Sequence, residues 1–211
     1  MRIVLRHLWS QMQHKFWDER YSDAALVYGE APNAFLVSLA SRLPPTGIAL
    51  DLGAGEGRNA LFLASLGLNV LAVDQSTVGM QKAQRLAADR GLRLTTQVAD
   101  LRDFDAPDSS FDVISSIFVH LPAAIRQRVH SRLASWLKPG GVFILEAYAP
   151  EQLQRTTGGP KDPALLAPMP DLLHELAALR LEHHAALVRP VVEGQFHTGD
   201  AAVIQIVAAK A

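Results

Sequence analysis

The residues whose types and spacing best suit chemistry form a glycine-rich run, Asp51–Asn59, which reads Asp-Leu-Gly-Ala-Gly-Glu-Gly-Arg-Asn. The run follows a short apolar segment and precedes an Ala/Leu-rich one, so it is expected to lead from a strand into a helix. Gly53, Gly55 and Gly57 allow the backbone to turn tightly and to lie against a ligand where a Cβ would clash. The spacing is G-x-G-x-G, whereas sites for a pyrophosphate typically have G-x-G-x-x-G. A ligand without a pyrophosphate is therefore favoured, and a glycine turn without any ligand is the alternative.

Acidic residues end three successive predicted strands. Asp51 ends the first strand, Asp74 lies 21 positions after Gly53 at the end of the second, and Asp100 ends the third. Open α/β sheets bind their ligands at the edge where these strand ends meet. An ionised carboxylate only accepts hydrogen bonds, which suits Asp74 for the two hydroxyls of a ribose and Asp100 for an adenine amino group. A ribose and an adenine without a phosphate are the features of S-adenosylmethionine.

Candidate groups for catalysis lie just after later strands. His120 follows the fourth predicted strand, and a neutral imidazole near pH 7 suits proton removal; the alternative is a histidine that is hydrogen-bonded to the backbone. Glu146 and Tyr148 flank the end of the fifth strand and are candidates to bind or orient a second substrate, although Glu146 can equally be a paired structural carboxylate. His197 is expected to be solvated in a turn. No metal site is predicted, because the adjacent pair His183-His184 points to different faces.

The elements that must position these residues alternate between β-like and helical patterns, which predicts a three-layer α/β/α sandwich with a mostly parallel sheet. A dinucleotide-binding domain would repeat βαβ units to its last strand, whereas here the last two strands are expected to form an antiparallel hairpin. The expected strands are Ile48–Asp51, Leu68–Asp74, Leu92–Ala99, Phe111–Phe118 and Val142–Ala147, with two more near Ala186–Glu193 and Ala201–Ala209. The expected helices are Arg58–Leu66, Ser76 to about Arg90, one between Pro122 and Pro139-Gly140-Gly141, and a short one with Leu172, Leu176 and Leu179.

Composition restricts the classes of function. Of the 211 residues, 49% are hydrophobic, so a sizeable core can form. Twenty basic residues face 21 acidic ones without a polybasic run, which disfavours a nucleic-acid partner. The absence of cysteine excludes disulfides, thiolate nucleophiles and Cys-ligated zinc, and fits a cytoplasmic location. The first residues are too short an apolar stretch for a signal sequence or a membrane span.

The length predicts one domain, 1–211, in three parts. Residues 1–45 are expected to be a helical cap over the site, 46–150 the cofactor-binding core, and 151–211 a lid loop, a helix and the hairpin. The stretch 151–169 is rich in Gly, Pro and Thr, and a disordered connection is the alternative to a lid. An amphipathic N-terminal helix is indicated by Leu5, Leu8, Met12 and Phe16 at helical spacing.

The order of these motifs resembles that of class I S-adenosylmethionine-dependent methyltransferases. The motifs are Asp51–Gly57, Asp74, Asp100, Phe111–Ile114 and Leu137–Gly141, within roughly Ile48 to Ala147. The resemblance implies a seven-stranded sheet with a reversed last strand, and S-adenosylmethionine as cofactor. The implied cofactor-binding residues are Trp17, Arg20, Tyr21, Asp51, Gly53, Ala54, Gly55, Gly57, Arg58, Asn59, Asp74, Gln75, Ser76, Asp100, Leu101 and Ser116.

A narrower resemblance is to the bacterial tellurite-resistance and thiopurine methyltransferase-like branch. It rests on Trp17–Tyr21, Tyr28-Gly29, Pro32-Asn33, Gly57–Asn59 and Phe143–Tyr148. It implies that the N-terminal segment folds over the cofactor, with Trp17, Arg20 and Tyr21 near its methionine end and Arg20 paired with the methionine carboxylate. Many relatives have Cys where this chain has Ala54, and both residues are small.

The expected function is therefore in-line transfer of a methyl group from S-adenosylmethionine to a small-molecule acceptor. Such a reaction depends on alignment and exclusion of water. A thiol or a chalcogen oxyanion is the acceptor that the narrower resemblance favours; a hydroxyl or ammonium acceptor would need a general base. The alternatives are an NAD-dependent oxidoreductase, which the glycine spacing and the terminal hairpin disfavour, and a non-catalytic S-adenosylmethionine-binding module.

Overall fold

The computed structural model describes residues 14–194 and 196–211. Of the expected N-terminal amphipathic helix, Leu5, Leu8 and Met12 lie outside the described residues, whereas residues 14–20, which include Phe16, are helical. Among the residues described, no helix is long and apolar enough to cross a membrane.

In the described residues seven strands form one sheet in the order β3-β2-β1-β4-β5-β7-β6, which confirms the predicted seven-stranded sheet. The strands are β1 Gly47–Leu52, β2 Leu68–Asp74, β3 Leu94–Val98, β4 Phe111–Ile117, β5 Leu137–Tyr148, β6 Arg180–Glu193 and β7 His197–Ala209. The first five pair in parallel. β7 pairs antiparallel with both β5 and β6, which gives the terminal hairpin. The carboxyl ends of the five parallel strands therefore meet at one edge, which is called the carboxyl edge below.

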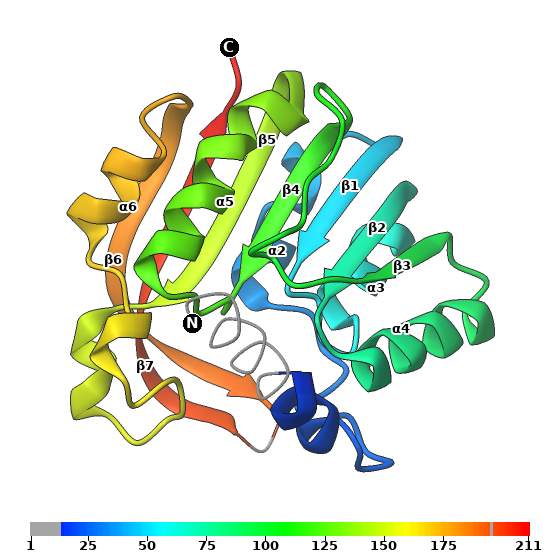
Figure 1. The fold of residues 1–211 in the computed structure, drawn as a ribbon, viewed down its shortest axis with the longest axis horizontal. Helices are drawn as coiled ribbons and strands as arrows, with labels where there is room; N and C mark the ends of the chain where they lie inside the picture. Colours follow the sequence, from blue (N-terminus) through cyan, green and yellow to red (C-terminus); the bar gives the residue numbers. More distant parts are fainter. Residues whose placement is uncertain (1–13, 195) are drawn as a thin grey trace, which may run out of the picture.

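Helices cover both faces of the sheet, which confirms the three-layer prediction. They are α2 Ala34–Ser38, α3 Arg58–Ser65, α4 Thr77–Asp89, α5 Ala123–Trp136 and α6 Met169–Glu175, with short 3₁₀ helices η1 Ala40–Arg42, η2 Pro150–Gln154 and η3 Pro163–Leu165. The core on one face contains side chains of α2, α3 and α4, and the core on the other contains those of α5 and α6. Figure 1 shows α5 in front of the sheet and α2 behind it. Glu175 of α6 pairs with two residues of α5, Arg126 at 2.9 Å and His130 at 2.7 Å, and so holds the two helices together.

The largest differences from the predicted boundaries are at the starts of β5, β6 and β7. β5 begins at Leu137, directly after α5, because Leu137 pairs with Phe111 before the register shifts. The predicted strand began only at Val142, since a Pro-Gly-Gly sequence normally marks a break. β6 and β7 also begin earlier than predicted. The segment 151–169, expected to be a lid, contains η2 and η3. It is anchored to β7, because the Gln152 side-chain oxygen accepts a hydrogen bond from the Ala202 amide at 2.9 Å.

The β6–β7 hairpin extends beyond the carboxyl edge. The last pair of β5 with β7 is Tyr148 with Val203, but β6 and β7 remain paired as far as Glu193 and His197. This overhang (orange to red in Figure 1) reaches the N-terminal segment. There, Gly194 packs so closely against the backbone of residues 27–28 that an added Cβ would lie 2.3 Å from the Val27 carbonyl oxygen. The overhang and the N-terminal segment thus lie over the same edge of the sheet.

Candidate functional site

The glycine-rich run forms a tight loop between β1 and α3. Gly53 and Gly55 have φ angles of +63° and +56°, which favour glycine. An added Cβ on Gly53 would lie 2.7 Å from Val119 Cγ2, and one on Gly55 would lie 2.7 Å from the hydroxyl oxygen of Tyr21. The loop therefore has a side-chain-free surface enclosed between the segment after β4 and the N-terminal segment.

Asp74 connects this loop to the end of β2. Its Oδ2 accepts a hydrogen bond from the Gly55 amide at 2.9 Å, and its Oδ1 accepts one from the Ser76 amide at 2.8 Å. Burial raises the pKa of Asp74, and the two amide hydrogen bonds partly oppose that shift. Each carboxylate oxygen has a further lone pair, so Asp74 can still accept hydrogen bonds from a ligand diol.

Asp51 is almost fully buried at the end of β1. Its Oδ1 accepts a 2.6 Å hydrogen bond from the Ser115 hydroxyl, whereas its Oδ2 has no hydrogen-bond partner within the described residues. Burial raises the pKa of Asp51 to about 7, against the opposing effects of the Ser115 hydrogen bond and the Arg58 charge. A buried acceptor without a partner is costly, and a donor group on a ligand would satisfy it.

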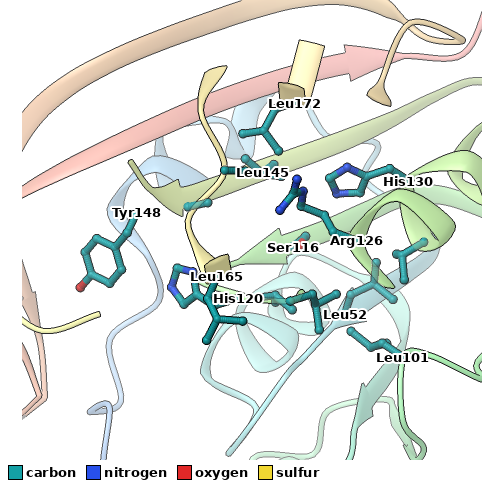
Figure 2. A pocket seen from close by; sticks show the side chains of 15 residues that line it. Leu52, Leu101, Ser116, His120, Arg126, His130, Leu145, Tyr148, Leu165 and Leu172 are labelled. Atoms are coloured by element: carbon teal, nitrogen blue, oxygen red, sulfur yellow. The ribbon is translucent and has the colours of Figure 1, made fainter. Parts of the chain in front are cut away.

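The remaining predicted cofactor residues lie around these two carboxylates. Asp100 follows β3, and its Oδ1 accepts a hydrogen bond from the Arg102 amide at 2.8 Å. Gln75 lies between Asp74 and the helix cap Ser76, whose Oγ accepts from the Gly79 amide at 3.0 Å. A small cavity is lined by two predicted cofactor residues, Leu101 and Ser116, and by two candidate catalytic residues, His120 and Tyr148 (Figure 2).

The N-terminal segment is docked onto the loop by buried polar contacts. Asp18 Oδ1 accepts hydrogen bonds from the Ser76 hydroxyl at 2.6 Å and from the Val78 amide at 3.1 Å. Glu56 accepts a 2.7 Å hydrogen bond from the Val27 amide and pairs with Lys82 at 2.8 Å. These contacts hold residues 17–28 against the glycine loop and the start of α4.

Trp17 and Tyr21 stack with ring centroids 5.5 Å apart, and Tyr21 lies against Gly55. Arg20 lies farther out, with its guanidinium 4.3 Å from the centroid of the Phe196 ring and one nitrogen 3.5 Å from the Tyr28 hydroxyl. In this structure Arg20 thus links the N-terminal segment to the hairpin tip, and its pairing with a methionine carboxylate stays a prediction.

Arg58 and Asn59 face the N-terminal segment and β6 rather than the loop surface. Arg58 pairs with Glu193 at 2.5 Å and donates to the Ala31 carbonyl at 3.1 Å. Asn59 Oδ1 accepts a 2.9 Å hydrogen bond from the Asn33 amide. These contacts indicate that the two side chains position the segment above the cofactor loop.

An aromatic cluster lies beside the loop at the carboxyl edge. Its members, called the aromatic cluster below, are Tyr28, Phe118, His120, Tyr148 and His197. Phe118 has a φ angle of +55°, an unusual conformation for a non-glycine residue, and such strain is often associated with functional sites. Its ring stacks on Tyr148 with centroids 4.5 Å apart, and His120 stacks on the same tyrosine at 5.4 Å. Figure 2 shows His120 beside Leu165, with the Tyr148 hydroxyl pointing away from it.

The protonation states of this cluster follow from burial. Burial, together with the nearby His197, lowers the pKa of His120 to about 3, although a backbone hydrogen bond at Leu165 opposes the shift. Burial also raises the pKa of Tyr148, so its hydroxyl keeps the proton. Both the His120 Nε2 and the Tyr148 hydroxyl are buried without a hydrogen-bond partner in the described part of the chain.

Glu146 is fully buried and its carboxylate is surrounded by donors. Its Oε1 accepts hydrogen bonds from Arg189 Nε at 2.8 Å and from Gln205 Nε2 at 2.6 Å, and its Oε2 accepts from Asn33 Nδ2 and Arg189 Nη2, both at 2.5 Å. Of the two interpretations that the sequence leaves open, this geometry favours the paired carboxylate.

Comparisons with known proteins agree with this geometry. Residues 49–141 match the family described as a methyltransferase domain. A 2-heptyl-1-hydroxyquinolin-4(1H)-one methyltransferase from Mycobacteroides abscessus is 33% identical over 102 residues, which are 47% of this chain and 45% of that protein. The chain matches this family from β1 into β5, a stretch that includes the glycine loop, Asp74 and Asp100. It spans about half the length of the curated relatives that it matches.

Two solved structures show the same fold as this chain. One belongs to work on the conversion of a disulfide bond into a thioacetal group during echinomycin biosynthesis. Its TM-score is 0.76 at 20% identity, and the match covers 93% of this chain and 91% of that chain. The other is TehB from Haemophilus influenzae, with a TM-score of 0.69 at 16% identity, covering 94% of this chain and 67% of that chain.

The residues at this edge of the sheet fit S-adenosylmethionine, the cofactor that the sequence predicts. The side-chain-free surface at Gly53 and Gly55 allows close approach of a ligand, and Asp74 has free acceptor capacity at the next strand end. The unpartnered Oδ2 of Asp51 would accept from a donor such as an ammonium group.

The sequence does not indicate two residues of this site, His197 and Glu193. His197 was expected to be solvated, and this was wrong: its side chain is buried against Tyr28, Phe118 and Tyr148, with ring centroids 4.7–5.3 Å apart. The expectation failed because the hairpin extends farther than its apolar pattern indicates. Glu193 was not singled out, and two of its partners, Asn33 and Arg58, lie far away in the sequence.

Proposed function

We propose that this chain is a methyltransferase that transfers the methyl group of S-adenosylmethionine to a small-molecule acceptor by in-line displacement. One observation carries the proposal. Within the described residues, the buried side-chain polar atoms without a hydrogen-bond partner are Asp51 Oδ2, His120 Nε2, Tyr148 Oη and His197 Nδ1. All four lie at the carboxyl edge or on the overhang that covers it. Unsatisfied buried polar groups are rare, and their grouping in one place favours a binding site for ligands.

The cofactor supplies a methyl group on a positively charged sulfur, which leaves as a neutral thioether. We propose that Asp51, Asp74, Asp100 and the glycine loop hold the cofactor, with the other predicted cofactor residues around them. The docked N-terminal segment and the hairpin tip exclude water from the reacting groups, which contributes to alignment.

On the acceptor side, His120 and Tyr148 are proposed to contact the acceptor as neutral groups. His120 then accepts a hydrogen bond on Nε2, and Tyr148 donates one from its hydroxyl. Glu146 is proposed to act as a positioning residue, because its four hydrogen bonds leave no oxygen facing an acceptor.

A small-molecule acceptor is supported by the name of the Mycobacteroides abscessus relative, whose acceptor is a hydroxyquinolinone. A thiol or a chalcogen oxyanion is the finer proposal, and it rests on the sequence resemblance to the tellurite-resistance and thiopurine branch. A non-catalytic binding module would share the cofactor site but would show no turnover.

The deciding experiment is isothermal titration with S-adenosylmethionine, its demethylated product and NAD, followed by mass spectrometry of candidate acceptors. We expect micromolar binding of the first two ligands, no binding of NAD, and a mass increase of one methyl group on an acceptor. Binding of NAD alone would favour an oxidoreductase. Tight cofactor binding without methylation of any thiol, hydroxyl or oxyanion acceptor would favour the non-catalytic module.

A further inference from the structure

A histidine and a glutamate face each other at the tip of the β6–β7 hairpin. Glu193 and His197 are the last pair in the strand register, and His197 Nδ1 lies 3.9 Å from Glu193 Oε2. Both side chains are buried, with relative exposures of 5% for Glu193 and 9% for His197. The pair lies on the overhang that covers the carboxyl edge.

Glu193 is held in place and remains ionised. Its Oε1 accepts a 2.9 Å hydrogen bond from Asn33 Nδ2, and Arg58 pairs with its Oε2 at 2.5 Å. Arg189 lies 3.6 Å from Oε1. Burial raises the pKa of Glu193, but the contact with His197 and the two guanidinium groups outweigh it and bring the pKa to about 2. His197 Nδ1 therefore faces a permanent negative charge.

Two series of contacts lead from the glycine loop to His197. On one side, Tyr21 lies against Gly55 and its ring is 6.2 Å from that of Tyr28, which in turn is 4.7 Å from His197. On the other side, Val119 lies against Gly53, and the ring of the preceding Phe118 is 5.2 Å from His197. His197 is thus separated from the cofactor loop by two side chains in each series.

The two buried histidines of the aromatic cluster differ in what faces them. His120 stacks on Tyr148, and within the described residues no carboxylate is paired with it; with a pKa of about 3 it does not hold a proton at neutral pH. His197 is faced by Glu193 of β6 and by the rings of Tyr28, Phe118 and Tyr148. A carboxylate beside one imidazole nitrogen orients the ring and stabilises the imidazolium that forms when the other nitrogen takes a proton.

We propose that His197 is the general base of the methyl transfer and that Glu193 is its positioning residue. This rests on the proposed function. The nucleophilic O or S atom of the acceptor forms a bond with the methyl carbon, and the bond from that carbon to the sulfonium sulfur breaks with its electron pair going to sulfur. The proton of the acceptor O–H or S–H group passes to His197 Nε2, while the Nδ1–H faces Glu193.

A general base at His197 restricts the chemical class of the methyl acceptor. A chalcogen oxyanion has no proton to lose at its nucleophilic atom and would need no base. The guanidinium groups beside Glu193, those of Arg58 and Arg189, are already paired with carboxylates. The geometry therefore favours an acceptor with a thiol or hydroxyl group over an inorganic oxyanion.

The arrangement of the pair can be tested without turnover, by ¹⁵N NMR of the imidazole nitrogens in the full chain. His197→Gln assigns the resonances, because it removes only those of His197. The expected tautomer has a proton on Nδ1 and none on Nε2. A proton on Nε2 with a bare Nδ1 would overturn the positioning role of Glu193.

The kinetic test compares His197→Gln with His184→Gln, the same change at an exposed position of the same hairpin. The probes are 2-mercaptoethanol, a phenol and tellurite. For a thiol or phenol that the wild type methylates, His197→Gln is expected to lower kcat by about 100-fold or more and to remove the acidic limb of the pH–rate profile. The KM for the acceptor and the affinity for S-adenosylmethionine should not change, and His184→Gln should behave as the wild type.

The outcomes separate the two proposals. An unchanged kcat and pH profile in His197→Gln would overturn the role of His197 as base. Methylation of tellurite alone, at equal rates in both variants, would overturn the acceptor class. A wild-type protein that binds the cofactor and methylates no probe would count against the proposed function, and the NMR result would still decide the arrangement of the pair. Glu193→Gln is not the primary variant, because Glu193 also anchors Asn33 and Arg58.

Discussion

Asn33 Nδ2 donates a 2.5 Å hydrogen bond to Glu146 Oε2, although 113 positions separate the two residues in the chain. The same amide nitrogen donates to Glu193 Oε1 at 2.9 Å, so one side chain joins the N-terminal segment, β5 and β6. Arg58 and Arg189 balance the charges of the two glutamates. This charge-balanced network lies beneath the aromatic cluster and fixes the position of the hairpin that contains His197.

The first prediction concerns this network. Glu146→Gln should lower the free energy of unfolding by about 3–5 kcal/mol, because it leaves the largely buried Arg189 without its closest charged partner. Urea denaturation followed by circular dichroism measures the change, and Glu151→Gln, at an exposed position, is the matched control. Unchanged stability together with a large loss of kcat would show that Glu146 acts in catalysis and not in positioning.

The second prediction uses two glycines with similar backbone conformations. Gly55 and Gly91 have φ angles of +56° and +63°, so alanine adds about 1–2 kcal/mol of backbone strain at either position. An added Cβ meets Tyr21 at Gly55, but meets nothing within 4 Å at Gly91. Gly55→Ala should therefore abolish cofactor binding in isothermal titration, whereas Gly91→Ala should lose only stability. Equal cofactor affinity in the two variants would contradict the assignment of the loop surface.

The third prediction tests the ribose assignment. Asp74→Ala should weaken S-adenosylmethionine binding by roughly 10- to 100-fold, the value of one lost hydrogen bond to a charged group. Asp89→Ala, an exposed aspartate near the end of α4, is the control and should bind as the wild type. Because Asp74 also accepts from the Gly55 and Ser76 amides, the stability of each variant must be measured alongside. Unchanged affinity in a folded Asp74→Ala protein would remove the assignment.

The fold and the cofactor loop are predictable because their signals are local. The strand before Asp51, the glycine run and the helix after it follow one another within a few residues, and β2 ends at Asp74 as predicted. The terminal hairpin is also indicated by two apolar segments around a Gly-rich turn. In each case the sequence pattern and the hydrogen bonds that stabilise the element involve neighbouring residues.

The acceptor side is harder to predict because its contacts are between distant residues. The residues around His197 have the composition of a turn. Only the extended pairing of β6 with β7 brings His197 into contact with Tyr28. Glu146 has partners at positions 33, 189 and 205, and no sequence spacing indicates that they meet. The β5 start at Leu137 likewise depends on pairing with Phe111, which overrides the local tendency of Pro-Gly-Gly to break a strand.

The last prediction follows from Asp51. Its folded pKa, about 7, lies above its ordinary value of 3.8, so the native state holds the proton more tightly than the unfolded state does. The contribution of Asp51 to the free energy of unfolding is therefore most favourable below pH 3.8. It becomes less favourable as the pH rises from 3.8 to about 7. Asp51→Asn removes the titration and keeps an acceptor for the Ser115 hydroxyl. The variant should therefore be more stable than the wild type by roughly 2–4 kcal/mol at pH 8, with the difference vanishing near pH 4.

Asp112 of β4 provides a control of opposite sign. Burial raises the pKa of Asp112, but the hydrogen bonds from Lys138 and the Ile48 amide outweigh it and leave the pKa lowered. Asp112→Asn should therefore cost stability at neutral pH, and this cost should shrink as the pH falls below about 4. Urea unfolding curves from about pH 2.5 to pH 8 test both variants. If the Asp51→Asn and wild-type curves run parallel across this range, the carboxylate of Asp51 is not held at a raised pKa. Its free oxygen would then not be the acceptor that the cofactor satisfies.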